Sequence, residues 1–330
     1  MTNVRVAIVG LGKMGLLHAS ILNVLNNATV VAFCEKSALV RRFARSIIPD
    51  IPFVRELNDL AGINPDGVYV TTPESTHYPI IKTIYDQSIT PNIFVEKPLA
   101  TSYLEAQELS NLATRSRGVN MVGYNRRYSV TFGKAKQILE EGLVGKLITF
   151  EGHAFSSDFV ETNFNNQDLA RKSALSDLGC HVIDLALWLF GPLELSKNLS
   201  ISTHNIKPTD RTSFELVTQE NSGSLKGILS ISRCMVDYRL PEMALQINGT
   251  NGTIKVDEDK IELKLNGNEV LHWYKHDLDD HVPFFIGGTE YVREDMQFIN
   301  SILNETKAEP DFQTASYVER IIEQLYSKQC

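Results

Sequence analysis

Short apolar runs alternate with amphipathic segments over roughly the first third of the chain. The runs are rich in β-branched residues and predict parallel strands buried on both faces, and the segments between them have helical spacing. The predicted strands are 4–9, 29–34, 53–54, 67–72, 93–96 and 120–124, and the predicted helices are 14–25, 39–48, 77–85 and 103–113. Strands that alternate with helices make right-handed crossovers and build a doubly wound parallel sheet.

The pattern changes near residue 125. A helix over 130–141 and a strand over 147–155 precede a polar stretch, and a strongly apolar helix follows over 177–190. Strand-like runs then come one after another without a helix between them: 199–204, 212–218, 223–232, 244–248, 253–256, 260–265 and 269–274. Two helices, 291–303 and 315–326, follow these runs. Strands without crossovers predict an open, largely antiparallel sheet.

The expected fold class is therefore α/β in the first part and α+β in the second. At roughly 150 residues per domain, 330 residues also predict two domains. We place the first domain, with its doubly wound parallel sheet, at residues 1–123 and the second, α+β domain at residues 124–330.

Composition and charge limit which cell compartment and which binding partners are expected. With 32 Lys and Arg against 40 Asp and Glu, the net charge is −8, so nucleic acid is not an expected partner. No apolar run is long enough to span a membrane, and the first strand begins too early to leave room for a signal peptide. The irregular spacing of Cys34, Cys180, Cys234 and Cys330 indicates reduced thiols, so we expect a cytoplasmic protein without a disulfide framework or a zinc site.

A glycine-rich loop, Gly-Leu-Gly-Lys-Met-Gly, joins the first strand to the first helix. This spacing, after a buried strand and before a helix, is typical of dinucleotide binding. Gly10 permits the tight turn, Gly12 lets the backbone approach a pyrophosphate, and Gly15 allows close packing of helix on strand. Lys13 and Met14 open the helix, whose N-terminal N–H groups favour an anion, so both are expected at the cofactor.

An acidic residue stands where this motif predicts one, at the end of the second strand. Glu35 follows Gly15 by 20 residues and would accept hydrogen bonds from the adenosine ribose, which favours NAD. Lys36 beside it could accommodate a 2′-phosphate, so NADP remains possible. A second glycine-rich run, 248–253, has no helix behind it and predicts a β-hairpin turn instead.

Polar residues end two further strands of the predicted parallel sheet, at the edge where such sheets bind ligands. Thr72 and Pro73 end the fourth strand, and His77 follows a short turn later. Glu96 and Lys97 end the fifth strand. Lys97 would lie near the nicotinamide of a cofactor placed along this edge, or it would be a solvated loop residue.

Two further groups of polar residues are candidates for chemistry. Arg126 and Arg127 follow the sixth strand and would either clamp a polar substrate or pair with surface carboxylates. Asp177, His181 and Asp184 share one face of a predicted helix, and a carboxylate one turn before a histidine suits general acid–base work. The same residues could instead form a helix cap and a buried hydrogen bond. No second histidine lies nearby, so a metal site is not expected.

These clusters, in this order, resemble the Gfo/Idh/MocA family, which includes glucose–fructose oxidoreductase and inositol dehydrogenase. The resemblance is carried by segments 10–15, 72–77, 96–98, 123–128, 140–146, 177–191 and 249–254. Glu-Lys-Pro combined with the Asp-x-x-x-His helix is its specific part. It implies a Rossmann domain for NAD or NADP, and a second domain that binds substrate and forms a homodimer or homotetramer through its sheet.

The resemblance also implies a role for individual residues. Lys97 would be the active-site lysine and Asp177 with His181 the catalytic pair, and Arg127 would join these three in the substrate pocket together with segment 155–172. The residues implied along the cofactor are Thr72, Pro73, His77, Glu96 and Asn125. Glu74 stands where the family often has Asn, and Lys172-Ser173 stands where a Gly-Gly pair is common.

The expected reaction moves a hydride between nicotinamide and a secondary alcohol or ketone carbon of a sugar, polyol or sugar nucleotide. His181 would remove the hydroxyl proton, Asp177 would steady the imidazolium, and Lys97 would stabilise the developing alkoxide without a metal. An NAD-dependent glycosidase is an alternative. A regulator that binds NAD and sugar without chemistry is a second alternative, although it would be expected to lack the lysine or the Asp/His pair.

Overall fold

The computed structural model describes residues 3–158, 174–196, 211–218, 225–267, 270–278 and 281–329. The chain forms two compact units, of which the first combines the segment up to Asn125 with Val282–Glu323, and the second combines Arg126–His281 with the segment from Gln324. We had expected residues 124–330 in one domain, and part of that range instead groups with the first unit. The strand expected over 199–204 lies outside the described residues.

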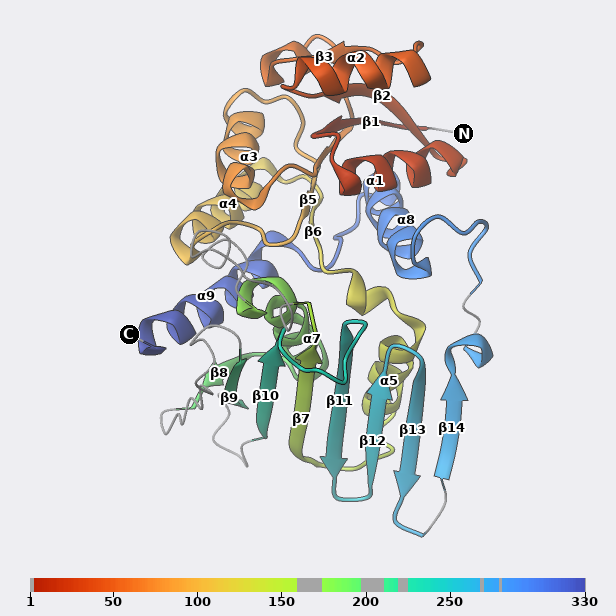
Figure 1. Ribbon diagram of the computed structural model, residues 1–330, viewed down its shortest axis with the longest axis vertical. Helices are drawn as coiled ribbons and strands as arrows, with labels where there is room; N and C mark the ends of the chain where they lie inside the picture. Colours follow the sequence, from red (N-terminus) through yellow and green to blue (C-terminus); the bar gives the residue numbers. More distant parts are fainter. Residues whose placement is uncertain are drawn as a thin grey trace. The chain divides into compact units, whose positions relative to one another are not determined.

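Six parallel strands form the sheet of the first unit in the order β3-β2-β1-β4-β5-β6 (Figure 1). They are β1 Val4–Val9, β2 Ala28–Cys34, β3 Phe53–Val54, β4 Gly67–Val70, β5 Ile93–Glu96 and β6 Asn120–Gly123. The strand order reverses between β1 and β4, and a ligand binds at the carboxyl edge of such a switch point. The predicted doubly wound parallel sheet is confirmed.

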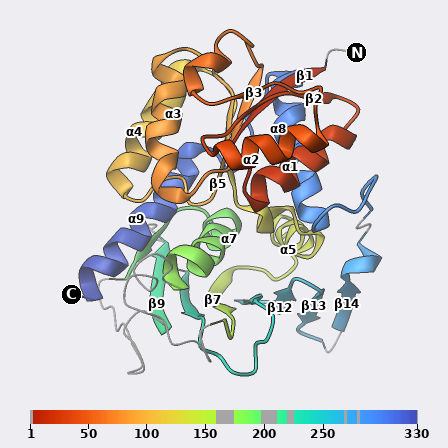
Figure 2. The same ribbon diagram turned by 45° about the horizontal axis from the view of Figure 1, so that its top comes forward.

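Helices cover both faces of this sheet. They are α1 Lys13–Val24, α2 Ala38–Ile47, α3 His77–Asp86, α4 Tyr103–Ser116, α8 Thr289–Asn304 and α9 Phe312–Gln329, the last of which continues into the second unit. Figure 2 shows α3 beside α4 and α8 beside α1. Single 3₁₀ turns are η1 Leu57–Leu60, η2 Glu74–Thr76, η3 Asn125–Tyr128 and η5 Lys275–Asp277.

Helix α8 explains why the late segment belongs to the first unit. Its Val292, Phe298 and Ile299 are fully buried, and α8 contacts α1, β1 and β6. The ring of Phe298 meets Tyr69 of β4 edge-on, with 5.3 Å between centroids. The apolar face of α8 therefore forms part of the same core as the strands that precede it by more than half the chain.

The second unit contains an eight-stranded sheet in the order β14-β13-β12-β11-β7-β10-β9-β8. The strands are β7 Leu147–Phe155, β8 Leu193–Leu195, β9 Arg211–Thr218, β10 Lys226–Ser232, β11 Glu242–Gly249, β12 Gly252–Asp257, β13 Lys260–Leu265 and β14 Val270–Tyr274. Only β7 and β10 pair in parallel among these strands. The open, largely antiparallel sheet is confirmed, and β11 and β12 form the hairpin predicted at 248–253.

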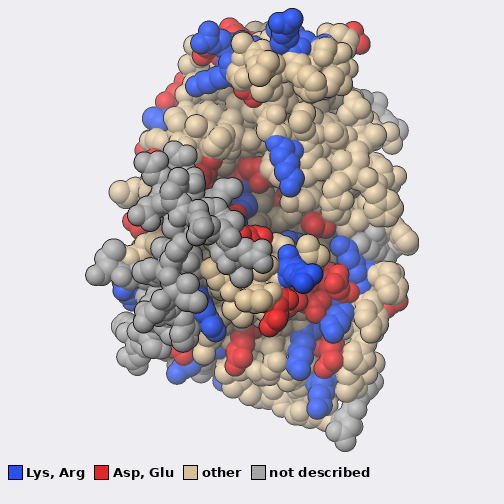
Figure 3. Space-filling model, in the orientation of Figure 1, with Lys and Arg blue, Asp and Glu red and all other residues tan. Residues whose placement is uncertain are grey.

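Helices α5 Val130–Glu140 and α7 Cys180–Phe190 pack on one face of this sheet. Along β12 and β13 the apolar residues are buried and the polar ones point the other way. On that outer face Lys255 stands opposite Glu262, and Figure 3 shows basic and acidic side chains side by side over these strands. In the described part of the chain, no helix is long and apolar enough to cross a membrane.

Helix α9 buries an acidic residue beside the Lys97 loop. Glu319 is 6% exposed and accepts a hydrogen bond from the backbone of Leu99. Burial raises the pKa of Glu319 to about 8, the charge of Glu74 adds to the rise, and the Leu99 hydrogen bond opposes it. The side chain is therefore largely protonated at neutral pH.

We expect this carboxyl to make the protein less stable as the pH rises from about 4.5 to about 8, because across that window the folded state binds a proton that the unfolded chain has lost. Glu319→Gln should remove this dependence and stabilise the protein at pH 8 by on the order of 3 kcal/mol. Thermal unfolding at pH 5.5 and pH 8 measures the effect, with exposed Glu305→Gln as the control. Equal pH slopes for wild type and Glu319→Gln would contradict the expectation.

Candidate cofactor and active site

The glycine loop lies between β1 and α1, at the carboxyl edge of the parallel sheet. Gly10 has a φ of +95°, which favours glycine, and a Cβ there would lie 2.7 Å from Cγ2 of Thr72. A Cβ on Gly15 would collide with the carbonyl oxygen of Gly10. Gly12 caps α1, and the space that its Cβ would occupy is open. A ligand can therefore approach the first turn of α1, which Lys13 and Met14 begin.

A cavity of 510 Å³ opens beside this loop. Six of the residues predicted at the cofactor line it: Gly10, Gly12, Glu35, Lys36, Thr72 and Pro73. Arg55, Asn58 and Ile80 also line the cavity, although no sequence motif pointed to them. A volume of this size is ordinary for a small-molecule site, so the residues fit one end of a dinucleotide.

Glu35 is held in place by two backbone amides. Its Oε2 accepts from the amide of Leu11 at 2.9 Å, and its Oε1 accepts from the amide of Ser37 at 2.8 Å. A carboxylate offers about four acceptor sites, so it can still accept from ribose hydroxyls. Arg41 donates to the carbonyl oxygens of Glu35 and Lys36, which places a second cation beside Lys36.

The loops after β4 and β5 are tied together by His77. The hydroxyl of Thr71 donates to the Gly10 carbonyl at 2.8 Å, and His77 lies with Nδ1 2.7 Å from the Pro98 carbonyl and Nε2 2.8 Å from the Thr72 carbonyl. Burial lowers the pKa of His77, and the hydrogen bonds to the Pro98 and Thr72 carbonyls oppose this shift. His77 is 1% exposed and acts on the shape of these loops.

Glu96 ends β5 with its carboxylate directed inward. It is 8% exposed, its Oε1 lies 3.0 Å from Nε2 of His18, and its Oε2 accepts from the backbone amide of Lys97 at 3.2 Å. His18 in turn contacts Asp295 of α8 at 2.8 Å. Glu96 was predicted to lie along the cofactor, whereas His18 and Asp295 stand in no sequence motif and were not predicted. Asn125, also expected along the cofactor, begins η3 and is 4% exposed.

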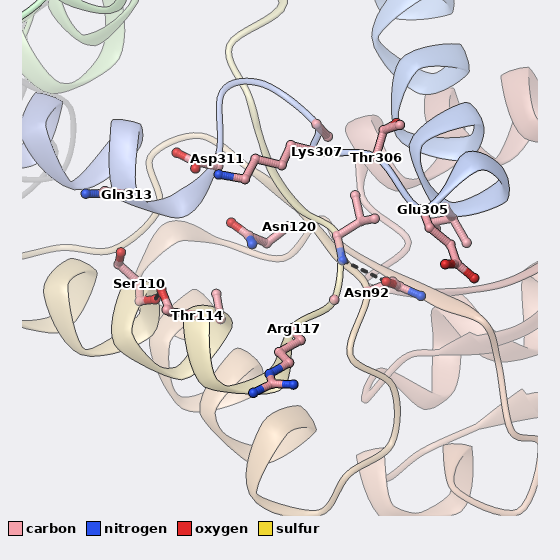
Figure 4. Close-up of a pocket in the computed structure, with 15 residues that line it drawn as sticks. Asn92, Ser110, Thr114, Arg117, Asn120, Glu305, Thr306, Lys307, Asp311 and Gln313 are labelled. Atoms are coloured by element: carbon pink, nitrogen blue, oxygen red, sulfur yellow. Dashed lines mark hydrogen bonds between the residues drawn. The ribbon is translucent and has the colours of Figure 1, made fainter.

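A larger cavity, of 650 Å³, lies at the opposite edge of the same sheet (Figure 4). Asn92 and Asn120, at the beginnings of β5 and β6, line it, and Oδ1 of Asn92 accepts from the amide of Val119 at 2.8 Å. None of the site residues predicted from the sequence lines this cavity. The six predicted cofactor residues named above line the smaller cavity.

In the second unit, Arg127 is paired with Asp184. Its Nε and Nη2 donate to the two carboxylate oxygens at 2.7 and 2.6 Å, and both side chains are almost completely buried. The guanidinium also lies 5.8 Å from the ring of Trp188. Arg127 was predicted to bind substrate, but in the structure its guanidinium forms two hydrogen bonds with the carboxylate of Asp184.

We expect Asp184→Ala to destabilise the protein by about 3–5 kcal/mol, because it leaves a buried guanidinium without its counter-charge. Chemical denaturation of Asp184→Ala, of a control variant and of wild type measures this loss of stability. Glu258→Ala is the matched control, since its pair with Arg126 at 3.0 Å is partly exposed and worth about 0–1 kcal/mol. Equal losses of stability in Asp184→Ala and Glu258→Ala would show that burial does not increase the contribution of the Arg127–Asp184 pair.

Asp177 and His181 lie on either side of a change in helix type. Asp177 belongs to a single π-helical turn, η4 Leu175–Gly179, whereas His181 lies in α7. The single α-helix expected over 177–190 is therefore corrected to a π turn followed by an α-helix. A Cβ on Gly179 would lie 2.8 Å from Cδ1 of Ile231, so this turn packs closely on β10. Such turns occur frequently at functional sites.

Arg233, just after β10, holds the carboxylate of Asp177. Its Nη1 lies 3.1 Å from Oδ2 of Asp177 and its Nη2 lies 3.2 Å from Oδ2 of Asp158, and Arg233 is 7% exposed. Arg233 stands in no recognisable sequence motif and was therefore not predicted. Segment 155–172 was expected to line the substrate pocket, and residues 159–172 of it lie outside the described residues. Among those described, no cluster of His, Cys, Asp and Glu could hold a metal ion.

Comparison with known proteins identifies both halves of the chain. Residues 4–124 match a family model described as an oxidoreductase family with an NAD-binding Rossmann fold. Residues 132–255 match the model of the GFO/IDH/MocA C-terminal domain. The two models together cover most of the chain.

Relatives of known sequence are oxidoreductases. An uncharacterised oxidoreductase of Schizosaccharomyces pombe is 27% identical, over 81% of this chain and 74% of its own. The scyllo-inositol 2-dehydrogenase (NADP⁺) of Bacillus subtilis is 25% identical, over 68% of this chain and 62% of its own. The D-glucoside 3-dehydrogenase of Escherichia coli is 25% identical, over 57% and 54%. The matches to these two dehydrogenases span less than two thirds of their lengths.

Solved structures share the whole fold. Levoglucosan dehydrogenase in complex with NADH and levoglucosan has a TM-score of 0.84 at 18% identity, over 99% of this chain and 97% of the other. An oxidoreductase of Agrobacterium radiobacter in complex with NAD⁺, L-tartaric acid and magnesium has a TM-score of 0.83 at 16% identity, over 99% and 96%. With both halves matching the two models of one family, the chain belongs to the Gfo/Idh/MocA family of NAD-binding oxidoreductases.

Proposed function

We propose that this protein is a dehydrogenase that moves a hydride between a nicotinamide cofactor and a secondary alcohol or ketone carbon of a sugar, polyol or sugar nucleotide. The observation that carries this proposal is the cavity at the glycine loop. Its walls combine an open helix N-terminus at Gly12 with a fixed carboxylate at Glu35, and it lies at the edge where Lys97 follows β5. A pyrophosphate and a ribose find matching groups there.

Each proposed catalytic residue has a separate task. When bound, the nicotinamide ring supplies the hydride acceptor. The Lys97 ammonium stabilises the alkoxide oxygen as the carbinol hydrogen leaves, and His181 accepts the hydroxyl proton. Asp177, whose carboxylate is held by Arg233, stabilises the positive charge that His181 acquires. The reverse sequence reduces a ketone.

We propose NAD as the preferred cofactor, because the carboxylate of Glu35 would repel a 2′-phosphate. Glu35→Gln removes that charge and keeps the shape of the side chain. We expect this variant to lose about 10-fold in kcat/KM with NAD and to gain in use of NADP, in line with the loss of a charged hydrogen bond worth about 1.5 kcal/mol.

Steady-state rates with both cofactors test this prediction, and Glu56→Gln is the control, since Glu56 lines the same cavity with a side chain that is 60% exposed. An unchanged ratio of NAD to NADP efficiency in Glu35→Gln would remove Glu35 from cofactor choice. One relative, the scyllo-inositol 2-dehydrogenase of Bacillus subtilis, is named as an NADP⁺ enzyme.

A substrate panel tests the proposed reaction. Sugars, polyols and sugar nucleotides are each incubated with NAD or NADP, and the absorbance band of the reduced nicotinamide is followed. We expect one chemical class to give sustained reduction. Release of an aglycone without net absorbance change would identify a glycosidase, and binding without turnover of any compound would identify a regulator. Either outcome overturns the proposal.

We also propose that the outer face of the second sheet joins copies of this chain into a homodimer or homotetramer. Ile228 of β10 is 49% exposed and stands opposite Glu151 of β7, whereas Phe150 and Leu229, which point to the other face of the sheet, are fully buried. Light scattering of wild type and of Ile228→Lys tests this. A monomeric wild type would refute the proposal.

A further inference from the structure

A buried chain of charged side chains ends at the Lys97 loop. It runs from Asp295 on α8 through His18 on α1 to Glu96 at the end of β5, and His18 and Asp295 are 0% exposed. Both carboxylate oxygens of Asp295 face Nδ1 of His18, at 2.8 and 3.0 Å, and Oε1 of Glu96 lies 3.0 Å from Nε2. Three elements that are distant in the sequence thus meet at one imidazole ring.

The contacts of His18 fix its charge. Ionised carboxylates accept hydrogen bonds and do not donate them, so both ring nitrogens carry a proton and the ring is an imidazolium. Burial alone would lower the pKa of His18, but Asp295 and Glu96 together raise it well above its ordinary value. Burial raises the pKa values of Asp295 and of the neighbouring Glu294, and the charge of His18 opposes both rises. The chain therefore centres on one imidazole ring that two carboxyl groups share.

Aromatic rings surround this cation and keep water away. The ring centroids of Tyr69, Phe94 and Tyr291 lie 5.4, 5.0 and 6.3 Å from that of His18. Tyr69 also forms a hydrogen bond with Asp295. Hydrogen bonds between charged groups are strong in such surroundings, so the positions of the three charged side chains are closely coupled.

The chain reaches Lys97 through the second oxygen of Glu96. While Oε1 faces His18, Oε2 accepts from the backbone amide of Lys97. A Cβ on Gly123 would lie 3.3 Å from this Oε2, so the carboxylate is also confined by β6. The orientation that His18 imposes on Glu96 therefore decides where the main chain of Lys97 lies and where its side chain begins.

We infer that His18 and Asp295 are positioning residues for Lys97, acting through the carboxylate of Glu96 and the Lys97 backbone amide. Neither residue touches substrate or cofactor in this role, because both are fully buried. Helix α8 thereby helps to place a lysine at the carboxyl edge of the sheet. The inference rests on the proposed function in one respect, since it takes Lys97 as the active-site lysine.

The first test is His18→Asn, which cannot reach both carboxylates. We expect kcat, measured with the substrate that the panel identifies, to fall by about 10- to 100-fold, as a small misplacement of a reacting group does. The dissociation constant for the cofactor should stay within about 2-fold. The matched control is His153→Asn, which removes another His–Glu contact of 3.0 Å on the second sheet and should leave kcat unchanged.

A double-mutant cycle separates positioning of Lys97 from a structural effect. If His18 acts through Lys97, adding His18→Asn to Lys97→Met should lower kcat no further, whereas independent effects would multiply. Multiplying losses would overturn the inference. Wild-type turnover by Lys97→Met alone would instead overturn the proposed function, so the two failures can be told apart.

A milder variant and a second readout keep the test decisive if His18→Asn does not fold. Asp295→Asn weakens the same chain from its far end. The acetylation rate of Lys97 by acetic anhydride, measured by peptide mass spectrometry, needs no substrate, and we expect it to change several-fold in Asp295→Asn while exposed Lys260 keeps its rate. A lowered melting temperature with unchanged kcat and unchanged Lys97 acetylation would reduce His18 and Asp295 to a structural pair.

Discussion

Lys97→Met is expected to lower kcat by about 10²–10³-fold while the protein still folds and binds its cofactor. Methionine keeps much of the length and apolar stem of lysine, but it offers no positive charge to a developing alkoxide. Loss of one such preorganised group costs this much in other enzymes. Because the side chain of Lys97 is proposed to act on the transition state, KM for the alcohol should change far less than kcat.

Two measurements check this prediction: steady-state kinetics with the substrate that the panel identifies, and cofactor binding by quenching of protein fluorescence. Lys82→Met is the matched control in the same unit, because Lys82 is partly exposed and pairs with Asp86 and Glu108 on the helical surface. A Lys97→Met enzyme within 2-fold of wild type would remove this lysine from the mechanism.

The second large effect is expected at His181. His181→Ala should lower kcat by about 10²–10⁴-fold, the usual loss when a general base is removed. The acid limb of the pH–rate profile should flatten in the variant, because the group whose protonation stops the reaction is gone. Added imidazole should restore part of the rate, since a small base can enter the space that the ring has left.

The control for His181→Ala is His272→Ala, because His272 lies on β14, is half exposed and has no role in the proposed mechanism. An acid limb that persists in His181→Ala, together with no rescue by imidazole, would assign the proton transfer to another group. Asp177→Asn should lose less than His181→Ala, since it weakens the support of the base and keeps the base itself.

The sequence predicted what depends on local pattern. The parallel sheet and the 248–253 hairpin follow from periodicity and turn residues, and the glycine loop from the spacing of Gly10, Gly12 and Gly15. The π turn before α7 was not predictable in this way, because one extra residue in a turn leaves the apolar pattern looking α-helical. Local sequence patterns therefore predict the helices and strands, but they do not reveal a change from α-helical to π-helical winding.

The sequence could not predict which distant residues pair with each other. His18 looks like one polar position in an apolar helix, and its partner Asp295 stands 277 residues later. Arg127 and Asp184 were both noticed, yet only their folded positions show that each satisfies the other. The amphipathic pattern of 291–303 predicted that this helix buries one face, but a single sequence does not say against which sheet.

The return of α8 to the first unit has a consequence for synthesis on the ribosome. A nascent chain that has emerged only as far as β6 has all six strands of the parallel sheet, but it lacks the face that α8 covers and the carboxylate that neutralises His18. Domains commonly fold in order as they emerge. Here all the strands of the second unit leave the ribosome before α8 does, so the first unit begins to fold before those strands are made and closes only after them.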